Sequence, residues 1–92
     1  MRKVRTHKFN GVKYELDIYT AMDGQCDFRH NKDATPYIIT SCKPYTKLWL
    51  ETLIHESLHA EDWRQTEHTV GRVAKEISDL LWRIGWRCDV LL

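Results

Sequence analysis

Hydrophobic and polar residues alternate along residues 12–18. The apolar positions of this run are Val12, Tyr14, Leu16 and Ile18. A period of two predicts a β-strand with one buried face. Asn10-Gly11 lies between this run and Lys8-Phe9. Because that dipeptide suits the left-handed backbone of a tight two-residue turn, the sequence predicts a β-hairpin.

Two further segments precede the helical part of the chain. Residues 20–35 are rich in turn-forming residues and predict a loop, with a short strand over 25–28. Residues 37–40, which follow Pro36, are aromatic and β-branched and predict a third strand. At a sheet edge, the backbone of this strand could pair with an extended peptide. The alternative is an edge that binds nothing.

The pattern changes to a helical period after Pro44, which suits a first helical turn. Apolar residues recur at helical spacing at Leu50, Leu53, Ile54 and Leu58. This spacing predicts a helix over about 45–60.

A second helix is predicted from Thr66, a favourable N-cap residue, to Gly85, which suits a C-terminal cap. Its expected buried stripe is Val70, Val73, Ala74, Ile77, Leu80, Leu81 and Ile84. Residues 86–92 are left as a short tail. Three strands followed by two helices predict an α+β fold.

Length and charge narrow the picture. The 92 residues suit one domain, over 1–92, with a single small core. The 14 Lys and Arg residues nearly balance the 13 Asp and Glu residues, so the net charge of +1 gives no reason to expect nucleic acid or a membrane as partner. The basic residues near the N-terminus read as a solvated arm. We find no signal peptide and no run of about 20 apolar residues, and therefore expect a soluble, cytoplasmic protein.

Cysteine and tryptophan add two structural expectations. Cys26, Cys42 and Cys88 are widely spaced and odd in number, which favours reduced, buried thiols in an intracellular protein. The four tryptophans are expected mainly to close the core. They are Trp49, Trp63, Trp82 and Trp86.

The chemically distinctive stretch is His55-Glu56-Ser57-Leu58-His59, within the first predicted helix. Histidines four residues apart lie one turn apart on one helix face, where both imidazoles can bind the same metal ion. The glutamate between them can act as a general base towards a water activated by zinc. Ordinary hydrogen-bonded histidines, with Glu56 in a surface ion pair, are the alternative.

A catalytic zinc site needs a third protein ligand. Glu61 and Asp62 follow His59 too closely to fold back easily onto the metal. On the second helix, Glu67 lies about 80° from the centre of the expected stripe near Ile77, Glu76 lies about 100° away on the other flank, and His68 lies nearly opposite. Glu67 is preferred, with Glu76 and His68 left open. A carboxylate in a first helical turn also has a purely electrostatic explanation.

The motif from His55 to His59 and Glu67 at the start of the next helix resemble the small zincin-like metallopeptidases of bacteriophages and prophages. The likeness extends to Gly24-Gln25-Cys26-Asp27, residues 37–40, Thr52-Leu53-Ile54 and residues 70–87. More distantly, the chain resembles the ImmA/IrrE-type zincins among the gluzincins. This resemblance implies a minimal zincin core, in which a short twisted sheet packs on the motif helix and a glutamate-bearing helix follows.

The resemblance also implies roles for individual residues. His55, His59 and Glu67 would bind Zn²⁺, and Glu56 would act as general acid and base. The expected function is hydrolysis of a peptide or protein substrate by a zinc metallopeptidase. The alternative is a zinc-stabilised protein-binding module of phage origin with little or no catalysis, since a chain of this length has little room for specificity pockets. The sequence predicts no oligomeric state.

Overall fold

A β-hairpin begins the fold, in a computed structural model that describes residues 3–19, 36–40 and 42–86. Strands β1 (Thr6–Phe9) and β2 (Val12–Asp17) pair in antiparallel fashion, with Phe9 opposite Val12. Both turn residues are left-handed, with φ of 50° at Asn10 and 77° at Gly11. These angles match the predicted two-residue turn, because a type I′ turn requires positive φ at both positions.

The predicted alternation along β2 is present in its central part. Tyr14 and, just after the strand, Ile18 are buried, whereas the charged residues between them are exposed. Val12 departs from the pattern, since it lies at the hairpin end and is 47% exposed. The strand therefore turns one apolar face towards the interior, as a half-buried strand should.

Strand β3 (Tyr37–Ile39) confirms the third predicted strand and pairs in parallel with β2. The sheet order is β1-β2-β3, so β3 is an outer strand of the sheet that the described residues form. Ile38 is fully buried, and the buried Thr40 hydroxyl donates to the Ile18 carbonyl at 3.4 Å. The loop predicted over 20–35, including its short strand over 25–28, lies outside the described residues.

Helix α1 (Lys47–Glu61) begins two residues later than expected. Tyr45 has a φ of 69°, which a right-handed helix does not allow, so Pro44 lies before the helix rather than in its first turn. Thr46 is the N-cap, and its hydroxyl accepts a hydrogen bond from the Trp49 amide at 3.2 Å. The strained residue before the cap therefore fixes where the helix starts.

Helix α2 (Glu67–Arg83) has the end signals that the sequence predicts. The Thr66 side chain caps its start by accepting from the Thr69 amide at 3.1 Å. After its end, Gly85 has a φ of 95°, and the Trp86 amide donates to the Leu81 carbonyl at 2.9 Å. This is the closing pattern in which a glycine takes the left-handed position.

The buried face of α2 differs from the expected stripe. Its buried residues are Val70, Ala74 and Ser78. Three members of the expected stripe are exposed, namely Ile77 at 39%, Leu80 at 56% and Ile84 at 70%. The expected centre near Ile77 is therefore wrong. Small side chains let α2 pack closely on α1 through the face that carries Ala74 and Ser78, and this contact turns the larger apolar residues outward.

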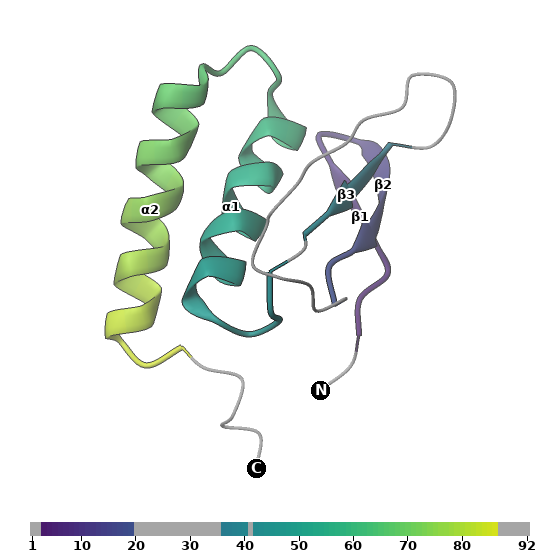
Figure 1. The fold of residues 1–92 in the computed structure, drawn as a ribbon. Helices are drawn as coiled ribbons and strands as arrows, with labels where there is room; N and C mark the ends of the chain where they lie inside the picture. The colour runs from purple at the N-terminus through teal and green to yellow at the C-terminus, as the bar shows by residue number, and fades with distance from the viewer. Residues whose placement is uncertain (1–2, 20–35, 41, 87–92) are drawn as a thin grey trace.

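The elements form three layers, with α1 between α2 and the sheet (Figure 1). The main core lies between α1 and the sheet. Its buried members are Tyr14, Ile18, Ile38, Cys42, Trp49 and Ala60. The Trp49 indole also donates to the Ile18 carbonyl at 2.5 Å. The chain is therefore an α+β fold in which α1 has one face on the core and another on α2.

An ion-pair cluster joins the start of α1 to α2. The Asp79 carboxylate accepts hydrogen bonds from Lys47 and from Lys75, the latter at 2.9 Å. These two bonds hold the pKa of Asp79 below its usual value, against the opposing effect of burial. The charges tie the two helices together at the end opposite the helix-to-helix turn.

Cys42 corrects the expectation for the thiols. It is disulfide-bonded, whereas all three cysteines were expected to be reduced. Cys26 and Cys88 lie outside the described residues. The argument for an intracellular protein from reduced cysteines therefore does not hold.

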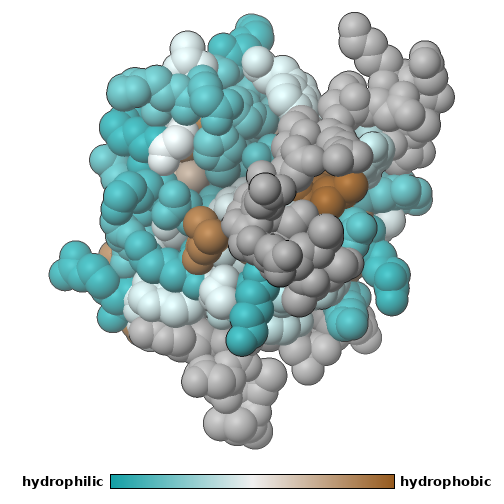
Figure 2. Space-filling model, viewed as in Figure 1, coloured by the Kyte–Doolittle hydropathy of each residue, from teal (hydrophilic) through white to brown (hydrophobic). Residues whose placement is uncertain are grey.

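One face of the molecule is largely polar. Figure 2 shows mostly hydrophilic side chains over the helices on the face viewed, with small hydrophobic areas only. No helix among the described residues combines the length and the apolar character that crossing a bilayer requires.

Candidate metal centre

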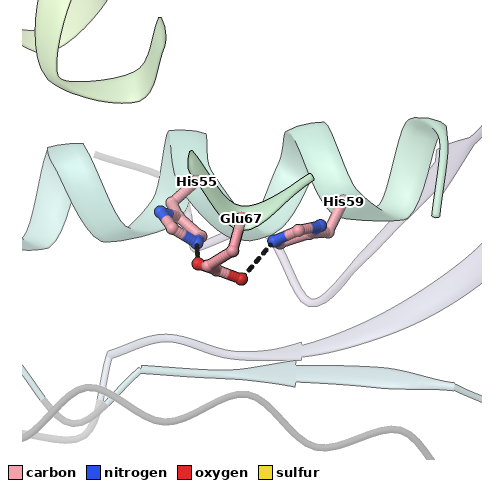
Figure 3. Close-up of side chains that lie close together, drawn as sticks. All are labelled: His55, His59 and Glu67. Atoms are coloured by element: carbon pink, nitrogen blue, oxygen red, sulfur yellow. Dashed lines mark hydrogen bonds and ion pairs between the residues drawn. The ribbon is translucent and has the colours of Figure 1, made fainter. Parts of the chain in front are cut away.

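Helix α1 presents His55 and His59 one turn apart on one face, as their spacing predicts. Both rings point their Nε2 atoms at the carboxylate of Glu67, which comes from the start of α2 (Figure 3). Two helices thus contribute one cluster of three side chains.

The short connection between the helices brings Glu67 to this place. Only residues 62–66 separate α1 from α2, so the helices form an antiparallel hairpin and the first turn of α2 lies beside the last turns of α1. The connection is held by the side-chain amide of Gln65, which donates to the Leu58 carbonyl at 3.1 Å. Because Glu67 is the first residue of α2, this turn fixes its position.

The distances in the cluster are those of a closely packed donor set. Glu67 Oε2 lies 2.9 Å from His59 Nε2, and Oε1 contacts His55 Nε2. The potential ligand atoms all lie within 4.8 Å of one another. The side chain of His59 is 11% exposed and that of His55 24%, whereas Glu67 is 73% exposed. The imidazoles are therefore held by the fold, and the carboxylate closes the cluster from the solvent side.

The charge state of Glu67 suits a ligand. Burial alone would raise the pKa of its carboxyl, but hydrogen bonds from His59 and His55 and the field of the two imidazoles hold it below its ordinary value. The carboxyl is thus ionised at neutral pH, as a metal ligand must be.

The donor set fits zinc. Two imidazole nitrogens and one carboxylate oxygen are a known ligand set of catalytic zinc, which leaves a fourth position for water or substrate. Ligand atoms of a tetrahedral zinc ion lie about 3.4 Å apart, given bonds of about 2.0 to 2.1 Å. Separations below 4.8 Å therefore need only small side-chain movements to reach that geometry.

Space around the first histidine allows this arrangement. Gly71 of α2 faces His55, and a Cβ atom at that position would lie 3.9 Å from its Cε1 atom, an ordinary contact. A methyl group at residue 71 would therefore fit beside the ring, and the close approach of α2 to His55 does not require glycine.

Glu56 lies beside the cluster, on the neighbouring part of α1. It lines a pocket of about 250 Å³ together with Glu51, Thr52 and His55. Its Oε2 atom is buried. A carboxylate that borders both a ligand histidine and an open pocket is suitably placed to exchange protons with a molecule in that pocket.

The other acidic and histidine candidates lie apart from the cluster. Glu76 is paired with Arg72 at 3.0 Å, and His68 is exposed. Glu61 accepts the Asn10 amide at 3.0 Å, and Asp62 is bound to Arg64. Among the described residues, only His55, His59 and Glu67 form a potential metal-binding group.

Sequence reasoning missed the role of Trp63, which was expected mainly to close the core. Trp63 is 48% exposed, and its indole stacks on His59, with ring centroids 5.6 Å apart and an interplanar angle of 13°. The indole nitrogen donates to the Tyr14 hydroxyl of β2 at 3.1 Å. Trp63 follows His59 by four residues, but α1 ends at Glu61, so this spacing alone could not have predicted the contact.

The chain matches no protein-family model, no curated protein and no solved structure. Function is therefore inferred from the side chains described above.

Proposed function

We propose that the chain is a zinc-dependent metallopeptidase of the gluzincin type. The observation that carries the proposal is the convergence of two Nε2 atoms and the Glu67 carboxylate beside Glu56. His55, His59 and Glu67 would hold the metal. When bound, zinc lowers the pKa of a water molecule and polarises a carbonyl group.

The chain's own residues supply the remaining chemistry. Glu56 accepts the proton of the attacking water and passes it to the nitrogen of the leaving amine, as a general base and then a general acid. The pocket that it shares with Thr52 gives the reacting group access to this carboxylate. The ligand residues come from helices that pack on each other, which supports a preorganised site.

An extended substrate fits best along the outer strand β3. A strand at a sheet edge offers backbone donors and acceptors to a peptide that lies beside it. The peptide would lie antiparallel to Tyr37–Ile39, along the edge of this strand that faces away from β2. Backbone pairing gives affinity with little demand on side-chain pockets, which suits a small domain.

The decisive variant is Glu56→Gln. The amide keeps the size of the side chain but accepts no proton, so zinc binding stays unchanged and hydrolysis falls by about 10²- to 10⁴-fold. Zinc content is measured by metal analysis, and turnover is measured on casein and on a peptide library with zinc-loaded protein.

Two controls define the result. A chelator should abolish cleavage by the parent, and His68→Ala should leave both readouts unchanged, since His68 is exposed beside Glu67 but outside the cluster. Cleavage by Glu56→Gln at the parent rate would contradict the mechanism. Stoichiometric zinc without any turnover by the parent would favour the zinc-stabilised binding module, and no zinc uptake would exclude both.

A further inference from the structure

Trp63 covers one face of His59 without belonging to the ligand set. The two rings are nearly parallel, at 13°, and their centroids lie 5.6 Å apart. This separation is within the range of offset aromatic stacking, which contributes about 0.5 to 1.5 kcal/mol beyond the area buried. Trp63 follows the end of α1 at Glu61, so the fold and not helical spacing alone brings it onto the ring.

Within the described part of the chain, the Nδ1 atom of His59 lacks the support that metal-bound histidines usually have. In most such sites the second ring nitrogen donates to a carboxylate, a carbonyl or water, and this contact sets the orientation of the ring. The Nδ1 atom of His59 is buried and has no hydrogen-bond partner among the described residues. The contact of Nε2 with Glu67 does not replace this second support, whereas the indole of Trp63 lies flat against the ring.

We propose that Trp63 is the positioning residue of the metal centre and that it orients His59 by ring stacking in place of a hydrogen bond. The inference rests on the proposed zinc site. An imidazole bound to a cation carries added positive charge, and indole is the best aromatic partner for positive charge. Stacking therefore stabilises the metal-bound ring more than the metal-free one.

Tyr14 holds the indole in this orientation. Its hydroxyl accepts the hydrogen bond of the Trp63 ring nitrogen at 3.1 Å. Tyr14 itself is 2% exposed and belongs to the core between α1 and the sheet. Strand β2 thus reaches His59 through two aromatic side chains, which links the sheet to a site built on helices.

The first test compares zinc affinities, measured by competition with a chelator of known affinity. Trp63→Leu should weaken zinc binding about 10-fold, whereas Trp63→Phe, which keeps a flat ring, should recover most of the loss. Tyr14→Phe, which removes only the hydroxyl, should cause a smaller loss. Trp82→Leu is the matched control, because Trp82 lies about 22 Å along α2 from Glu67.

The second test needs no metal. In the NMR spectrum of the metal-free protein, the stacked indole shifts the carbon-bound ring protons of His59 upfield, and Trp63→Leu should remove this shift while the remaining spectrum shows an intact fold. Wild-type zinc affinity in Trp63→Leu, or equal weakness in the Leu and Phe variants, would overturn the inference. A parent that shows the ring shift but binds no zinc would instead contradict the proposed function.

Discussion

At the scale of single residues, Glu67 decides whether the two histidines form a site. It is the first residue of α2, and its carboxylate meets both imidazoles. Its lowered pKa means that acid must go below the usual range of a glutamate before the carboxyl is protonated. Glu67 thus stays charged over the whole pH range in which histidines can bind a metal.

Replacing this carboxylate gives a sharp comparison. We expect Glu67→Ala to weaken zinc binding by at least about 10- to 100-fold, since losing a ligand should cost no less than losing a residue that supports one. Glu76→Ala also removes a carboxylate from α2, but this carboxylate pairs with Arg72. The substitution should therefore leave zinc affinity unchanged. Isothermal titration of both variants with zinc measures the difference. If Glu76→Ala weakened zinc binding and Glu67→Ala did not, the third ligand would be Glu76.

The residues of the candidate site were partly predictable from the sequence. The spacing of His55 and His59 on a helix is sufficient to place both rings on one face. Glu67 was preferred because of its angle from the expected buried stripe of α2. That stripe was centred near Ile77, which is 39% exposed and is not the centre of the buried face. The contact of Trp63 with His59 was not predicted, because Trp63 lies beyond the helix and its position depends on Tyr14 of a distant strand.

At the scale of elements, the two threonine caps allow an effect on the stability of a helix to be distinguished from an effect on metal binding. Thr46 caps α1 and Thr66 caps α2, each by accepting a hydrogen bond from the amide three residues later. Only the second cap stands beside a ligand residue, since Glu67 opens the first turn of α2.

We therefore expect unequal effects from equal substitutions. Thr46→Ala and Thr66→Ala should each lower the free energy of unfolding by about 1 kcal/mol. Thr66→Ala alone should also weaken zinc binding, by up to about fivefold, because a frayed first turn must be ordered again when Glu67 binds. Urea unfolding and zinc titration test the two effects. Equal zinc affinities in the two variants would mean that the cap does not support the site.

Periodicity and cap residues predicted most of the elements. The two-residue hairpin turn, the third strand, the Thr66 cap and the turn at Gly85 follow from local chemistry that neighbouring residues determine. The start of α1 was misplaced because Tyr45 takes a left-handed conformation that nothing in its residue type signals. The buried face of α2 was misplaced because packing on α1 prefers Ala74 and Ser78 over larger apolar residues.

At the scale of the whole molecule, the domain is small enough for one metal ion to change its stability. The chain of 92 residues has one main core, between α1 and the sheet. A domain of this length buries a limited fraction of its surface, so its margin of stability is small. A ligand that binds only the folded state adds directly to that margin.

Zinc addition should therefore raise the melting temperature. At a free zinc concentration 100 times the dissociation constant, the gain is about 2.7 kcal/mol, which corresponds to about 10 to 20 °C for a domain of this size. A chelator should reverse the shift, and His55→Ala should show none. Differential scanning calorimetry gives the measurement. An equal shift in His55→Ala would place the bound metal elsewhere.

The parallel pairing of β3 with β2 was the least predictable part of the arrangement. The sequence predicts both strands but not their relative direction, which depends on how the connection between them runs. That connection includes residues 20–35, whose local pattern predicts only a loop. The resulting order β1-β2-β3 sets β3 at the edge of the described sheet.

The helical hairpin that carries the three ligand residues also has a consequence for how the chain folds. His55 and Glu67 are only twelve residues apart, and one short turn brings them together. The β2–β3 pairing must instead join Glu15 to Tyr37 across a longer loop. Because near contacts close faster than distant ones, we expect the three candidate ligand side chains to meet before β3 pairs with β2. A metal ion held by these side chains would then bind before the sheet is complete.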